Sequence, residues 1–249
     1  MCVRYTFHRP DEALARVAAA LARKLAPLPE WARPRFNVTL THVVPVVAVG
    51  GEGPQVCGMR WGLVPFYERS KPQRRMLPNA KAETAVTLSA FKQAVAKRRC
   101  LVPANGFYEW QTFGKLKLPH LFTLRDEEPF AFAGIWEPAA ETEFEQEATE
   151  RTEGRKDLWA GTFSILTTEP NELVAPIHNR MPVILTAETM PRWLGSEPWP
   201  EAEYRALTQP LPAERMQSRP VSRFVSNSRN EGPACHAAPE AAPPELALG

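Results

Sequence analysis

A cysteine stands directly behind Met1, where it could become the first residue of the mature chain. Methionine is usually removed when the next side chain is small, and its removal would leave Cys2 with a free α-amine and a thiol. The pKa of an α-amine is about 7.7–8.0 and that of a thiol about 8.5, so both have nucleophilic forms near neutral pH. The amine can form an imine with an aldehyde, and the thiol can add to the same carbon and close a thiazolidine ring. This closure is intramolecular, and effective molarities of roughly 10⁵ M or more are then within reach.

Four further segments place polar side chains among aromatic residues and prolines. Taken singly, each also fits a structural role, because a lone glutamate in an aromatic strand is usually paired with an arginine and a lone histidine is usually satisfied. The segments therefore indicate a functional site only in combination with Cys2. They are residues 78–84 (PNAKAET), 103–110 (PANGFYEW), 175–182 (APIHNRMP) and 225–230 (VSNSRN).

Metal and cofactor chemistry has no support in the spacing of the usual ligands. The five histidines form no H-E-x-x-H or H-x-H motif. The cysteines are far apart and include no C-x-x-C pair, which argues against a zinc knuckle and a disulfide framework. We therefore expect no metal and no cofactor. The four cysteines are Cys2, Cys57, Cys100 and Cys235.

The elements that must position these residues are many short strands and few helices. Apolar spacing predicts helices from Pro10 to the residue before Pro27 and over residues 88–99, with short ones over 169–174 and 187–194, the last ending at Gly195. This order predicts an α+β fold, a single domain with a mainly antiparallel, barrel-like β core and flanking short helices. Strands are predicted over residues 38–49 (interrupted at Pro45), 59–64, 100–103, 107–111, 120–124, 129–136, 162–168, 181–185 and 220–225.

Composition sets the domain boundaries. Residues 138–158 are rich in glutamate, and we expect a solvated acidic insertion between two strands. Residues 233–249 are rich in alanine and proline, and we expect a disordered C-terminal tail. The folded domain is therefore predicted over residues 1–232.

Bulk properties describe an ordinary globular chain. The hydrophobic content is 44% and the net charge +2, so any contact with nucleic acid must come from a local basic surface. The sequence has no run of about 18 apolar residues that would predict a membrane span and no secretory h-region. We expect a cytoplasmic protein, associated with the nucleoid when on DNA, and a monomer.

With Cys2 and the four segments, the chain closely resembles the SOS response-associated peptidase (SRAP) family over roughly residues 2–232. Further motifs in the right order carry the resemblance: residues 60–65 (RWGLVP), 100–103 (CLVP) and 166–169 (LTTE). The resemblance implies an α+β domain with a basic groove that recognises abasic sites in single-stranded DNA. It also implies a DNA–protein crosslink, in which the N-terminal cysteine closes a thiazolidine with the C1′ aldehyde of the ring-opened deoxyribose.

The resemblance assigns four reacting or assisting residues. Cys2 supplies the amine and the thiol, and Asn79 hydrogen-bonds near the sugar and the Cys2 backbone. Glu109 handles protons during imine formation and ring closure, for which it must be partly buried to donate a proton near neutral pH. His178 lies against the sugar oxygen and assists ring opening as general acid or base.

The same resemblance assigns the DNA contacts. Arg4, Lys81 and Arg180 match positions that hold phosphates, which gives affinity that weakens with salt. Trp110 is expected to stack on or wedge beside a base. Asn37 matches a family asparagine near the site.

The sequence departs from the family pattern at a few positions. Val3 stands where glycine is frequent, and Lys81 replaces an arginine, which keeps the charge but loses the bidentate geometry. Residues 66–67 (FY) replace a tryptophan, and residues 39–40 (TL) replace Ala-Pro. None of these changes removes a reacting group, so we expect retained chemistry and altered DNA affinity.

Two other functions fit the same residues. A thiol peptidase, which could act only on its own N-terminus, would use Cys2 as nucleophile and His178 as base. A non-catalytic module for single-stranded DNA would use Trp110 and Arg180 and would bind intact and abasic DNA equally.

Overall fold

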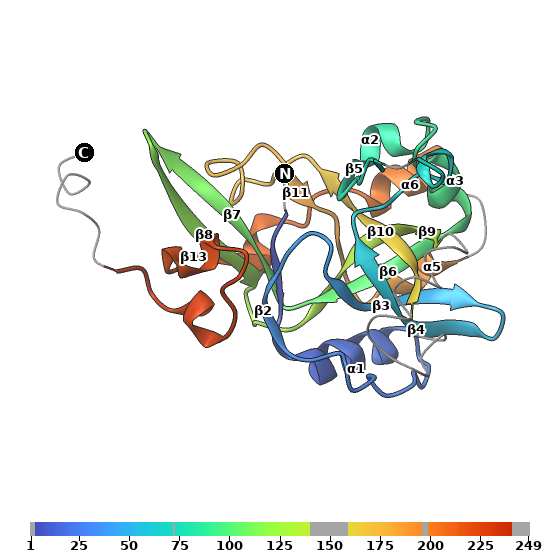
Figure 1. Cartoon of the computed structure of the whole chain (residues 1–249), viewed down its shortest axis with the longest axis horizontal. Coiled ribbons are helices and arrows are strands. Elements are labelled where there is room, and N and C mark those ends of the chain that lie inside the picture. The colour runs from blue at the N-terminus through green and yellow to red at the C-terminus, as the bar shows by residue number, and fades with distance from the viewer. Residues whose placement is uncertain (1–2, 72, 140–158, 196–198, 241–249) are drawn as a thin grey trace.

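A computed structural model describes residues 3–71, 73–139, 159–195 and 199–240 of the chain (Figure 1). Cys2, nearly all of the acidic insertion predicted over 138–158, and the end of the predicted tail lie outside the described residues. Within the described part of the chain, no helix is long and apolar enough to cross a membrane.

The smaller sheet has five antiparallel strands in the order β13-β8-β7-β1-β2. Its centre is a hairpin of two strands that turn at Gly114, whose φ of 56° suits glycine. Side chains alternate between the two faces of each strand, so this sheet has one face toward the core and one toward the C-terminal segment. The strands are β1 (Tyr5–Phe7), β2 (Arg35–Val38), β7 (Gly106–Phe113), β8 (Leu116–Leu124) and β13 (Met216–Pro220).

The larger sheet closes into a ring. Its strands follow the order β11-β10-β4-β3-β6-β9-β12, and β9 also pairs with β10. Most pairs are antiparallel, while β10 is parallel to β4 and to β5. Its strands are β3 (Val43–Gly50), β4 (Gly53–Trp61), β5 (Asn79–Lys81), β6 (Arg99–Ala104), β9 (Phe130–Pro138), β10 (Trp159–Thr168), β11 (Met181–Pro182) and β12 (Ile184–Leu185).

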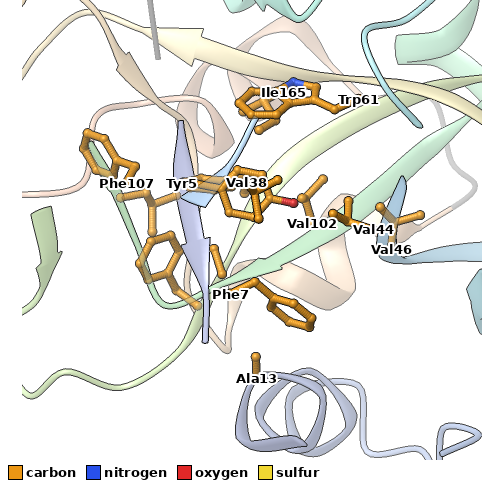
Figure 2. Packing of buried hydrophobic residues seen from close by; sticks show 14 of the residues in the cluster. Tyr5, Phe7, Ala13, Val38, Val44, Val46, Trp61, Val102, Phe107 and Ile165 are labelled. Carbon is orange, nitrogen blue, oxygen red and sulfur yellow. The ribbon is translucent and has the colours of Figure 1, made fainter. Parts of the chain in front are cut away.

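The main core lies between the two sheets (Figure 2). Tyr5 and Phe107 come from the smaller sheet, and Trp61 and Ile165 from the larger one, and all four are fully buried. The rings of Tyr5 and Trp61 meet edge to face with their centroids 5.2 Å apart. This contact couples β1, at the start of the chain, to the ring-shaped sheet.

Short helices flank the sheets. The longest, α1, buries Ala13, Leu14 and Val17 on one face, as the apolar spacing of its sequence predicts. The others are single turns or little more. The described helices are α1 (Pro10–Ala20), α2 (Ala82–Ala85), α3 (Lys92–Lys97), α5 (Thr189–Leu194) and α6 (Glu201–Leu207), with 3₁₀ turns η1 (Phe66–Glu68), η2 (Ala213–Arg215), η3 (Arg223–Ser226) and η4 (Pro233–His236).

The α+β class predicted from the sequence is confirmed, but some element predictions are wrong. The first helix ends at Ala20, well before Pro27, because Ala22 adopts a left-handed φ of 49°. Pro45 lies inside β3, since β6 pairs further along at Val47 and Ala48 and needs no N–H from the proline. The strand predicted over 38–49 is instead interrupted at residues 39–42, between β2 and β3.

Other helix predictions also differ from the structure. The helix predicted over 88–99 is confined to α3, and residues 172–177 form turns where a helix was predicted over 169–174. The helix α5 does end at Gly195, but the glycine has φ −55° and does not use its left-handed freedom.

The C-terminal segment differs most from its prediction. The last strand, β13, ends at Pro220, and η3 follows where a strand was predicted over 220–225. Beyond residue 232, where a disordered tail was predicted, η4 buries Cys235 completely in a small cluster with Tyr108 and Val225. The chain therefore continues the fold past residue 232.

Candidate functional site

The end of β10 brings two of the polar segments together. The strand β5 pairs with β10 in parallel, with Asn79 opposite Ile165 and Lys81 opposite Thr167. On its other edge, β11 pairs Met181 with Thr168, so the preceding residues 178–180 arrive at the same end of the strand. The predicted site residues Asn79, Lys81, His178 and Arg180 therefore belong to one corner of the fold.

Trp61 anchors this corner. Its indole Nε1 donates a hydrogen bond of 2.9 Å to the carbonyl of Pro78, directly before Asn79. Because the same indole packs against Tyr5, the position of Asn79 is tied to that of β1.

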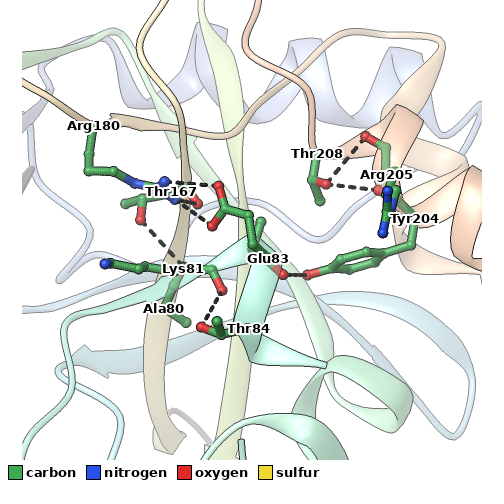
Figure 3. A network of polar contacts seen from close by, with 10 residues as sticks. Ala80, Lys81, Glu83, Thr84, Thr167, Arg180, Tyr204, Arg205 and Thr208 are labelled. Carbon is green, nitrogen blue, oxygen red and sulfur yellow. Dashed lines mark hydrogen bonds and ion pairs between the residues drawn. The ribbon is translucent and has the colours of Figure 1, made fainter. Parts of the chain in front are cut away.

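Arg180 is held inside the protein and is only 13% exposed (Figure 3). Its two terminal nitrogens donate to the two carboxylate oxygens of Glu83, each at 2.8 Å. One of them also donates to the carbonyl of Thr167 at 2.6 Å. Lys81 on the neighbouring strand is exposed and can reach a phosphate directly.

His178 lies against the backbone of Arg180. Its Nδ1 is 3.0 Å from the Arg180 amide nitrogen and 3.1 Å from the Arg180 carbonyl oxygen. Burial lowers the pKa of His178 below its usual value. The imidazole is therefore neutral at physiological pH, and its tautomer depends on which backbone group it bonds.

The carboxyl group of Glu109 is almost fully buried. It lies on β7 opposite His120 on β8 and is 4% exposed. Within the described residues, its Oε1 is buried without a hydrogen-bond partner. Burial raises the pKa of Glu109 to about 7, so this carboxyl group can give or take a proton at neutral pH.

Glu109 and Trp110 point to opposite faces of β7. Phe107, two residues before Glu109, packs in the main core, whereas Tyr108 and Trp110 pack in the small C-terminal cluster. Since side chains alternate along a strand, Glu109 shares the face of Phe107. Glu109 therefore faces the side of the main core, whereas Trp110 faces the C-terminal cluster.

Arg4 and Trp110 lie together on the face of β7 that is turned away from the main core. The Arg4 guanidinium lies 5.7 Å from the centre of the Trp110 ring, and it donates to the carbonyls of Val225 at 2.8 Å and Ser226 at 3.2 Å. Trp110 Nε1 donates to Ser226 Oγ at 2.9 Å. The segment predicted from residues 225–230 is thus fastened beside the aromatic ring.

Asn37 is fully buried and forms hydrogen bonds with the backbone of residues 225–230. Its Oδ1 accepts from Arg4, and its Nδ2 donates to the carbonyls of Val225, Asn227 and Asn230 at 2.9–3.2 Å. The sequence predicted Asn37 as a DNA contact. In the structure it has no exposed surface for DNA and instead organises the loop that borders Trp110.

Sequence reasoning missed three residues of these surfaces. Glu83 belongs to the quoted PNAKAET motif, but only its contact with Arg180 reveals a role. Ser226 was likewise inside a quoted motif. His120 gave no signal in the sequence, because its position opposite Glu109 depends on the register of the β7–β8 hairpin.

No group of three or more potential metal ligands is gathered among the residues that the structure describes. A cavity of about 820 Å³ lies on the far side of Glu83, between α2, α3 and α6. Its lining includes Glu83, Lys92 and Tyr204. It shares Glu83 with the corner at β10 but contains none of the predicted catalytic residues.

The fold and these motifs define a class of protein. The chain belongs to the SOS response associated peptidase (SRAP) family, whose sequence profile matches residues 1–228. Among its relatives, the abasic site processing protein YoqW of Bacillus subtilis is 33% identical over 201 residues, 80% of this chain and 84% of the relative. The abasic site processing protein HMCES of Gallus gallus is 32% identical over 203 residues, 71% of this chain and 55% of the relative.

A crystal structure of a protein from Bacteroides thetaiotaomicron has the same fold. It superposes with a TM-score of 0.75 at 27% identity and covers 95% of this chain and 99% of the other.

Proposed function

We propose that this chain recognises abasic sites in single-stranded DNA and captures them covalently through Cys2 once Met1 has been removed. The observation that carries the proposal is Glu109, a buried carboxyl group whose pKa is raised to about 7 in a strand that pairs with the start of the chain. The names of the curated relatives supply the abasic site as substrate.

The register of β1 and β7 supports a position for Cys2 beside Glu109. Tyr5 pairs with Phe107, and the Tyr108 amide donates to the Arg4 carbonyl at 3.0 Å. One further step in this antiparallel register puts Val3 opposite Glu109. Cys2 is bonded to Val3, and this register supports the proposal that its amine reacts beside the Glu109 carboxyl group.

The proposed chemistry has two bond-forming steps. The α-amine of Cys2 adds to the C1′ aldehyde, and the carbinolamine loses water after Glu109 protonates its hydroxyl group. The thiol then adds to the iminium carbon and gives its proton to the Glu109 carboxylate, which restores the acid and leaves a neutral ring nitrogen. One water is released overall, and a carboxyl group with a pKa near the working pH suits both transfers.

His178 assists the earlier opening of the deoxyribose. The C1′ hydroxyl proton is taken up as the ring C–O bond breaks, and the ring oxygen is protonated. A neutral imidazole can take up a proton at one ring nitrogen and release one from the other, so it can move such a proton. Exposed Lys81 supplies phosphate attraction at the same corner.

The test is a denaturing gel with single-stranded DNA that carries one abasic site, with Met1 removal checked by mass spectrometry. We expect a shifted band that requires the lesion and is lost in Cys2→Ala. The matched control is Cys57→Ala, which removes a half-buried thiol and keeps Cys2. A band of equal strength in Cys2→Ala would exclude the thiazolidine, and no covalent band in the processed protein would exclude the crosslink altogether.

The description of the family as a peptidase supports a second candidate, self-removal of Met1 by Cys2 with His178 as base. In that case Cys2→Ser and His178→Ala retain Met1 in the mass spectrum. Normal removal of Met1 in both variants would exclude it.

A further inference from the structure

We propose that Glu83 is a positioning residue for His178 and acts through Arg180. This inference deepens the proposed function, on which it rests, by adding a residue that acts through a neighbouring side chain. It starts from the observation that Glu83, on α2, forms an ion pair with Arg180, which belongs to a different motif 97 residues away.

Three hydrogen bonds hold the terminal nitrogens of Arg180. Both carboxylate oxygens of Glu83 accept hydrogen bonds from the guanidinium, and the Thr167 carbonyl accepts a third. A bidentate pair of this kind fixes the plane of the guanidinium as well as its distance. Because Thr167 belongs to β10, Arg180 is fixed relative to the larger sheet.

The fixed arginine determines how His178 is held. Nδ1 of His178 can accept from the Arg180 amide or donate to the Arg180 carbonyl, and it makes one of these bonds at a time. Each alternative leaves Nε2 in a different protonation state, so the tautomer depends on which Arg180 backbone group bonds the ring. If Arg180 moves, the ring loses both its orientation and its selected proton.

The surroundings of Glu83 fit a carboxylate that stays ionised. Burial is the largest single effect and raises its pKa, but the hydrogen bond from Arg180, a backbone hydrogen bond and the positive charges of Arg180 and Lys81 together lower the pKa to below its usual value. The side chain is 46% exposed and lines the 820 Å³ cavity, so its replacement by glutamine leaves no void and can be hydrated.

An alternative role for Glu83 is to compete with DNA. Its carboxylate occupies the donors that a phosphate would use on Arg180. The geometry favours positioning, because Arg180 also bonds Thr167 and is largely buried, whereas Lys81 beside it is exposed.

The experiment compares Glu83→Gln with Glu169→Gln. Glu169 follows β10 directly and lines the same cavity, so its variant removes an equal charge nearby. NMR follows the His178 ring signal through a pH titration, with its assignment from a His178→Gln variant. We expect Glu83→Gln alone to lower the pKa of His178, since the unmasked Arg180 charge disfavours the imidazolium and the backbone contact is loosened.

Crosslinking provides the second readout. In Glu83→Gln we expect a rate lower by about tenfold, less than the roughly hundredfold loss typical when a general acid–base group is removed. The limb of the pH–rate profile that reports His178 should move to lower pH. Glu83→Asp, which keeps the charge, should restore part of both properties.

Two results would overturn the inference. One is a His178 titration that is the same in Glu83→Gln and Glu169→Gln. The other is tighter DNA binding by Glu83→Gln with an unchanged His178 titration, which would identify Glu83 as a competitor of phosphate. Because the titration needs no crosslink, failure of the proposed function would appear separately, as a missing covalent band in the unmodified protein.

Discussion

At the scale of single residues, burial decides which groups can move protons. Glu109 is almost fully buried, and its pKa is raised to about 7. The pKa of His178 is shifted downward, because burial disfavours the charged imidazolium. These opposite pKa shifts let Glu109 exist in both protonation states near pH 7 and leave His178 largely neutral there.

Glu109→Gln should make the protein more stable at high pH and less active. The folded protein holds the Glu109 proton up to about pH 7, while an unfolded carboxyl group releases it near 4.5. Stability of the natural chain therefore falls as the pH rises between these values, by up to about 3 kcal/mol. Glutamine does not titrate, so the Glu109→Gln variant lacks this pH-dependent loss of stability.

Urea unfolding at pH 5 and pH 8 measures the effect. The gain of Glu109→Gln over the natural chain should be larger at pH 8, while crosslinking falls by about a hundredfold. An equal difference in stability at the two pH values would mean that the carboxyl group is not buried as described.

At the scale of elements, a short turn depends on a partner far away in the sequence. The segment around η3 is held by Asn37, which donates to three of its carbonyls. Just beyond it, η4 packs His236 against His8, with ring centroids 4.7 Å apart. The C-terminal part of the fold is thus fastened to the first two strands of the smaller sheet.

Asn37→Ala should destabilise the protein by about 2–3 kcal/mol, because it removes a buried amide that bonds three carbonyls, of which that of Val225 keeps a donor in Arg4. It should also weaken non-covalent binding of intact single-stranded DNA, since the loop beside Trp110 loses its support. Urea unfolding and fluorescence anisotropy measure the two effects. The exposed Ser228→Ala in the same loop serves as control, and equal behaviour of both variants would contradict this account.

At the scale of the whole molecule, a net charge of +2 cannot attract DNA by itself. Attraction must come from single exposed cations at the site, and Lys81 is one, whereas Arg180 is occupied by Glu83. The binding surface therefore depends on where charge is exposed more than on how much the chain carries.

Lys81→Ala should reduce the salt dependence of DNA binding. For single strands, the slope of log K against log salt should become shallower by about 0.7 if one phosphate contact is lost. The control is Lys92→Ala, an exposed lysine at the cavity beyond Glu83. Anisotropy titrations at several salt concentrations give the slopes, and the same change in both variants would point to total charge.

Local patterns in the sequence were sufficient for the α+β class and for most strands. The runs that became β3, β7 and β9 are rich in β-branched and aromatic residues, which fit a pleated, buried surface. Helix ends and the C-terminal segment were harder to predict. The left-handed turn at Ala22 is closed by backbone hydrogen bonds to Ala18 and Ala19 rather than by a glycine. Cys235 is buried only because distant parts of the chain pack there.

By itself, the sequence determined the family, the fold class and the motif residues, since these depend on residue types and short-range spacing. It also implied that Glu109 and Trp110 lie on opposite faces of a strand, because side chains alternate. Only the tertiary structure decided which face is the core, how far burial raises the pKa of Glu109, and that Arg180 is bound by Glu83. These properties depend on desolvation and on contacts between segments that are distant in the sequence, which no local pattern encodes.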